Sequence, residues 1–84
     1  MYSTLTESDL REAARLGEQC GSAAVSQRMY GRGPDTFSQR DYLRRMKNCY
    51  AAPDQARLQV AFDDAYKAVQ EAAAPMLAAT SRRI

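Results

Sequence analysis

Residues 53–76, PDQARLQVAFDDAYKAVQEAAAPM, carry the pattern that decides the fold. Apolar residues recur in this stretch in alternating steps of four and three, the spacing of a helix stripe that packs against other helices. The stripe consists of Leu58, Phe62, Ala65, Val69, Ala72 and Met76. We therefore predict a helix over residues 53–74, with Pro53 in its first turn. Pro75 lacks a backbone donor and predicts that the helix ends or kinks there, so residues 78–84 are expected to form a frayed tail.

A second long helix is expected upstream, over residues 7–29. Thr6 and Asp9 are three positions apart, as in a capping box, in which each side chain bonds the backbone N–H of the other residue. Leu5 and Leu10 lie on either side of this pair, at the positions of a hydrophobic staple. These local signals predict where the helix starts.

The inward face of this first helix carries unusually small residues. They recur at helical spacing and are Ala13, Gly17, Gly21 and Ala24. Two interpretations are open, because glycine costs about 1 kcal/mol relative to alanine inside a helix. The small residues form a smooth groove where a partner helix packs closely, or the helix breaks within residues 17–22.

A short middle helix is expected over residues 39–50. The glycine-rich stretch 30–36 before it is a loop, and Gly31 suits the end of the first helix. Ser38 and Asp41 repeat the capping-box spacing. The corresponding staple pair is Phe37 and Tyr42. The very short joint after this helix places consecutive helices side by side and roughly antiparallel.

These elements predict an all-α fold: a single domain over residues 1–84, built as a small three-helix bundle. Its two long helices would each span roughly 33–35 Å, whereas the middle helix would span only about 18 Å. Alanine occurs fifteen times, against twelve for Leu, Ile, Val and Phe together, so the core buries little area per residue. A short helix cannot cover two long ones, and we expect the bundle to be completed by self-association as a homodimer.

Charge is unevenly distributed along the chain. The net charge is +2, but residues 28–47 carry +4 between two segments of −2. One interpretation is intramolecular charge complementarity, and the other is contact with nucleic acid or an acidic partner. The basic candidates for such contacts are Arg28, Arg32, Arg40, Arg44, Arg45 and Lys47.

The sequence offers little of the chemistry that enzymes use. It has no histidine, the commonest general base, and none of the common catalytic or phosphate-binding motifs. Two cysteines alone do not complete a zinc shell, so we expect no catalytic residue, no metal and no cofactor. We expect no signal peptide or membrane span, and a cytoplasmic location in which Cys20 and Cys49 stay free. A disulfide between Cys20 and Cys49 remains the alternative.

The function expected from these patterns is non-enzymatic. We predict a protein–protein interaction module: a small helical regulator, inhibitor or assembly factor that docks on a larger protein. The predicted interface for a partner, or for a second copy, consists of the stripe on residues 58–76 and the small-residue face of the first helix. The alternative is a small nucleic-acid-binding regulator that uses the basic middle helix.

Overall fold

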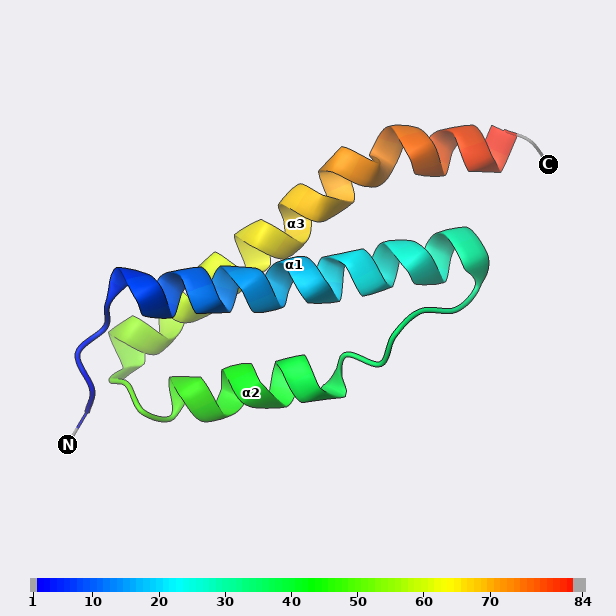
Figure 1. Ribbon diagram of the computed structural model, residues 1–84. Coiled ribbons are helices and arrows are strands. Elements are labelled where there is room, and N and C mark those ends of the chain that lie inside the picture. The colour runs from blue at the N-terminus through cyan, green and yellow to red at the C-terminus, as the bar shows by residue number, and fades with distance from the viewer. Residues whose placement is uncertain (1, 83–84) are drawn as a thin grey trace.

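The computed structural model describes residues 2–82, with side chains as far as residue 78, and is all-helical over that range. Its helices are α1 (Glu7–Tyr30), α2 (Phe37–Lys47) and α3 (Ala52–Arg82). The long helices α1 and α3 run in the same direction and pack against each other, while the short α2 runs back beside them (Figure 1). The predicted arrangement of two long helices and a short middle one is confirmed.

The start and end of α1 follow the local sequence signals. The Thr6 hydroxyl accepts a hydrogen bond from the Asp9 N–H at 3.2 Å, and the Asp9 carboxylate accepts one from the Thr6 N–H at 2.9 Å. Leu5 and Leu10 lie half-buried against the core. Gly31 ends the helix with φ of 72°, in the left-handed region that glycine adopts without strain. The capping box and the glycine stop are therefore confirmed.

The glycines of α1 pack against α3 and do not break the helix. A Cβ built on Gly17 would lie 2.2 Å from the backbone oxygen of Phe62, and one on Gly21 would lie 3.0 Å from the Cβ of Val69. The two helix backbones approach each other at these positions because no side chain separates them. The groove interpretation is correct, and the helix that fills the groove is α3 of the same chain.

The buried core is small and lies where the three helices meet. Its members are Ala13, Leu16, Cys20, Leu43, Tyr50, Leu58 and Phe62. The predicted stripe on α3 enters this core only in its first half, since Ala72 and Met76 are exposed. Ala73 is buried in place of Ala72. A straight helix repeats every 3.6 residues, so a strict heptad stripe drifts away from the core after a few turns.

α2 starts earlier than the sequence pattern predicts. Ser38 was the expected cap, but the helix already begins at Phe37 with Thr36 as its N-cap residue. The Asp35 carboxylate accepts a hydrogen bond from the Phe37 N–H at 2.9 Å and supports this start. Asp41 does not form a capping box, because its carboxylate binds the guanidinium groups of the arginines one turn later. The predicted cap was therefore wrong by two residues.

The end of α2 and its predicted staple also differ from expectation. Phe37 and Tyr42 are both largely exposed and do not pack as a staple pair. The helix ends at Lys47 and not at Tyr50, because a turn at Asn48 and Cys49 redirects the chain. This turn allows Tyr50 to enter the core.

α3 is longer than predicted. It continues to Arg82 with Pro75 inside it, so the expected end at residue 74 was wrong. Proline removes one backbone hydrogen bond and crowds the preceding turn, which bends a helix without always ending it. The ribbon of α3 changes direction in its orange part (Figure 1). Of the expected frayed tail, residues 78–82 are helical and residues 83–84 lie outside the described range.

Tyr50 ties the turn after α2 to the start of α1. Its side chain is only 6 % exposed, and its hydroxyl forms a hydrogen bond with the Asp9 carboxylate. This bond and burial raise the pKa of Tyr50 to about 12, and the same bond, with those from Thr6, lowers the pKa of Asp9. The bond requires a protonated tyrosine and an ionised aspartate.

The Tyr50 bond predicts a specific pH dependence of stability. A raised pKa of Tyr50 stabilises the fold below pH 10, and this contribution is lost as the pH rises from 10 to about 12. The lowered pKa of Asp9 stabilises the fold above pH 3.8, and its contribution is lost as the pH falls below that value. Tyr50→Phe should cost on the order of 1 kcal/mol at neutral pH and reduce the alkaline loss.

Urea denaturation followed by circular dichroism across this pH range measures the effect. Tyr42→Phe is the matched control, because Tyr42 is 54 % exposed on α2. The control should leave the unfolding midpoint unchanged at every pH. An alkaline loss of the same size in the wild type and in Tyr50→Phe would contradict the assignment.

Candidate functional site

Most of the predicted interface is occupied inside the chain. On α1, Ala13, Gly17 and Gly21 are buried, and Ala24 is half-buried. On α3, Leu58 and Phe62 are buried, Ala65 and Val69 are half-buried, and Ala72 and Met76 are exposed. The structure therefore uses the first half of this predicted surface to join α1 to α3. Only its second half is open to a partner.

α2 and the loop before it lie on one side of the α1–α3 pair. The Lys47 ammonium donates to the Gln59 side-chain oxygen at 2.7 Å, and the Arg40 guanidinium lies 5.8 Å from the centre of the Phe62 ring. At the other end, Gly33 lies against α1, where an added Cβ would be 2.6 Å from the backbone oxygen of Ala23. Gln59 on α3 and Ala23 on α1 therefore lie on the side of the pair that α2 and its preceding loop cover.

The opposite side of the pair has no helix over it in the described chain and carries mostly small apolar residues, with the exposed Glu18 between Ala14 and Val25 on α1 and Asp64 one turn before Ala68 on α3. Ala68 follows Gln59 by nine residues, or about two and a half turns, so it points away from α2. On α1, Val25 follows Ala23 by two residues and therefore points about 200° away from it, away from the loop before α2. We call this side the open face, and its residues are Ala14, Val25 and Met29 on α1 and Ala65, Ala68, Ala72 and Met76 on α3. Three of them, Ala68, Ala72 and Met76, are exposed and the others are half-buried.

Charged residues flank the open face, and most of them are paired within the chain. On the α1 flank, Arg11 lies 3.5 Å from Glu7. On the α3 flank, Arg57 lies 3.9 Å from Asp54, and Lys67 lies 4.0 Å from Glu71. Such exposed pairs contribute little to stability, but they balance the charge at the edges of the face.

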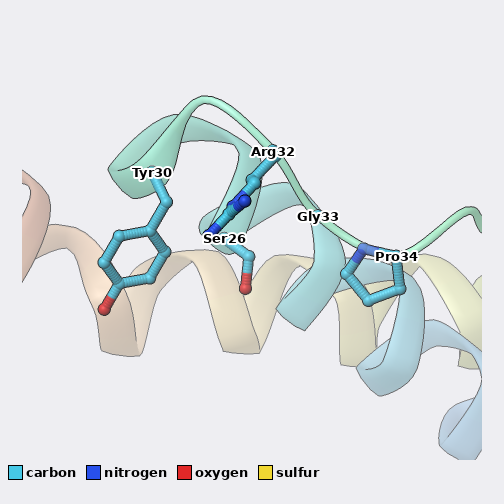
Figure 2. A pocket seen from close by; sticks show the side chains of 5 residues that line it. All are labelled: Ser26, Tyr30, Arg32, Gly33 and Pro34. Carbon is cyan, nitrogen blue, oxygen red and sulfur yellow. The ribbon is translucent and has the colours of Figure 1, made fainter.

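An open pocket of about 630 Å³ lies at the other end of the molecule from the N-terminus, beside the loop that follows α1. It is lined by Ser26, Tyr30, Arg32, Gly33 and Pro34, and Figure 2 shows the Ser26 and Tyr30 side chains pointing to the same side. Two hydroxyls and one guanidinium can donate hydrogen bonds to a polar ligand. The lining contains neither a carboxylate nor a thiol, so it provides no base to activate a hydroxyl.

The six basic candidates do not form one surface. Arg28 and Arg32 lie at the end of α1, whereas Arg44, Arg45 and Lys47 lie at the end of α2, at the opposite end of the molecule (Figure 1).

Several of these basic groups have partners within the chain. Arg44 and Arg45 contact the Asp41 carboxylate at 2.6 and 2.9 Å, and the Arg44 hydrogen bond is the main reason that the pKa of Asp41 is lowered. Arg40 lies over an aromatic ring, and Lys47 bonds Gln59. Much of this positive charge is therefore used in internal contacts.

The two cysteines are separate and free. Cys20 is buried in the core and Cys49 is exposed, so the disulfide alternative is not realised. Burial raises the pKa of the Cys20 thiol, which makes it a poor nucleophile. Within residues 2–82 no group of three or more potential metal ligands is present, and no helix is long and apolar enough to cross a membrane.

Ala65, Ala72 and Met76 of the open face belong to the predicted stripe, whereas the sequence pattern missed its other residues, which are Ala14, Val25, Met29 and Ala68. A signal for Ala68 exists, because alanines recur at residues 61, 65, 68 and 72 in steps of four, three and four, and two of them also belong to the predicted stripe. Comparison with protein families, with curated proteins and with solved structures finds no match to this chain. The function is therefore argued from the surface itself.

Proposed function

We propose that this protein is a non-enzymatic protein–protein interaction module that binds a helical partner on its open face. The observation that supports this proposal is the one-sided cover of the α1–α3 pair, which has α2 on one side and, on the other, mostly small apolar residues that no helix of the described chain covers. A role as a small regulator, inhibitor or assembly factor requires only such a surface and no catalytic group.

The residues of the open face suit a helix as the bound element. Ala65, Ala68 and Ala72 present only methyl groups, so the backbone of a partner helix can approach α3 closely. Met29 and Met76 add flexible side chains at one end, and methionine is enriched at protein interfaces. The docking of an amphipathic helix on an apolar helical surface is a common recognition mode.

Nucleic-acid binding is the less favoured of the two candidate functions. The positive groups are divided between the two ends of the molecule, and Asp41 neutralises part of the charge of Arg44 and Arg45. Sequence-independent binding to phosphates requires a continuous basic surface. The basic residues named here do not form such a surface.

Site-specific photo-crosslinking in the cells that express the protein tests the proposal. A benzophenone amino acid at Ala68 should give a discrete adduct, and the adduct should be lost when Ala72→Glu is added on the same face. The matched control is the same amino acid at Ala56, which is exposed on α3 but points about 120° away from Ala68. It should give no adduct.

Two results would contradict the proposal. One is equal labelling at Ala68 and Ala56, which would indicate random collision. The other is labelling at Ala68 that persists in the Ala72→Glu variant, which would show that the labelled contact does not depend on the open face.

A further inference from the structure

We infer that the occupant of the open face is a second copy of this chain, packed face to face about a two-fold axis. The two α1–α3 pairs would then form a four-helix core, with one α2 on each outer side. This inference rests on the proposed function, because it names the partner for the same surface.

The surface area of the single chain supports a second copy. Its accessible surface is 5974 Å², whereas a compact monomer of 9.4 kDa exposes about 5,000 Å². The excess of roughly 1,000 Å² is close to the area of about 800 Å² that each partner buries in a standard stable interface. A dimer through the open face would bring the exposed surface per chain to the value of a compact protein.

The elongated shape of the chain also supports a second copy as the occupant. Its radius of gyration is 14.9 Å and its extents are 55 × 20 × 17 Å, whereas a compact domain of this length has a radius of gyration of about 12 Å. The molecule is a rod because α1 and α3 are long and parallel and only the short α2 packs beside them. Packing a second rod along the open face would thicken the molecule across its long axis.

The chemistry of the face allows it to pack against itself. Ala68 and Ala72 permit an interhelical distance of about 8 Å, the short end of the usual range. Arg57 and Lys67 beside the face are each paired within the copy, and the net charge of the chain is only +2, which keeps the repulsion between two copies small. A two-fold arrangement uses the same face on both copies and stops at the dimer.

Sedimentation equilibrium of the purified chain, from about 1 to about 100 µM, tests the inference. The wild type should be a dimer, and Ala68→Glu should raise the dissociation constant at least about 100-fold, because it places a carboxylate in the apolar contact. Glutamate forms helices nearly as well as alanine, so circular dichroism should show unchanged helix content. Ala56→Glu is the matched control, because Ala56 is exposed on α3 and points about 120° away from Ala68, and this variant should remain a dimer.

Ala72→Glu provides a second, independent variant of the same face, should Ala68→Glu lose helix content. A folded Ala72→Glu chain should be monomeric where the wild type is dimeric. A wild type that is monomeric at every concentration overturns the inference. A dimer that survives both open-face changes with its helix content intact overturns it as well.

The crosslinking experiment separates this inference from the proposed function. An Ala68 adduct with twice the mass of the chain supports both. An Ala68 adduct to a different protein, with a monomeric wild type, overturns self-association and leaves the proposed function standing. No open-face adduct and no dimer would overturn both.

Discussion

Gly17→Ala is expected to destabilise the fold by about 2 kcal/mol or more, although alanine is the better helix former. The added Cβ would lie 2.2 Å from the backbone oxygen of Phe62, so α1 and α3 must move apart along their whole contact. Overpacking of a closed contact costs about 1–3 kcal/mol and occasionally more, and a clash with backbone at 2.2 Å places this change at about 3 kcal/mol or above. The gain of about 1 kcal/mol in helix propensity leaves about 2 kcal/mol or more. For a chain of this size the expected fall in Tm is roughly 10 °C.

Thermal unfolding followed by circular dichroism measures this change. Ser22→Ala is the control, because Ser22 is exposed in the same helix and the substitution improves helix propensity without entering the contact with α3. It should leave Tm unchanged or raise it slightly. A Tm that rises in Gly17→Ala as well would show that the two helices are not in close contact there.

Leu58→Ala is expected to have the largest effect of any single change. Leu58 is 0 % exposed and lies at the centre of a core in which few other large side chains are buried. Removing a buried leucine side chain costs about 2–5 kcal/mol, a large share of the stability of a small domain. The variant should be largely unfolded, or should unfold at much lower urea concentration than the wild type.

Val60→Ala is the control for this prediction. Val60 is two residues away on the same helix but 55 % exposed, so its loss should change the free energy of unfolding by no more than about 0.5 kcal/mol. Urea titrations of the two variants give the comparison directly. Similar unfolding midpoints for Leu58→Ala and Val60→Ala would contradict the assignment of Leu58 to the core.

The elements that could be predicted were those with a local physical cause. The Thr6–Asp9 capping box and Gly31 act within one turn of the helix, and both are present in the structure. The cap of α2 was misplaced because Asp41 has arginines one turn later, and these compete for its carboxylate. Pro75 was expected to end or kink α3, and the helix continues past it with a change of direction, because proline removes one hydrogen bond and the other bonds of the helix persist.

The candidate site depended on information that local patterns do not contain. The periodicity of α3 indicated a buried stripe but not which helix would cover it, and α1 covers the first half. The position of the open face follows from the side on which α2 returns, which neither a hydrophobic repeat nor a short joint determines. The alanines at Ala68 and Ala72 became distinguishable from core alanines only once α2 was placed opposite them.

The parallel pairing of α1 and α3 has a consequence for how the chain folds. Gly17 and Phe62 are in contact but are about 45 residues apart in sequence, so the main contact of the molecule closes a long loop at an entropic cost before it contributes stability. Folding should therefore be slower than in helical proteins whose neighbouring helices in sequence supply most of the contacts. α2 lies within that loop and has the smaller share of the packing, so we expect it to open before the long pair separates.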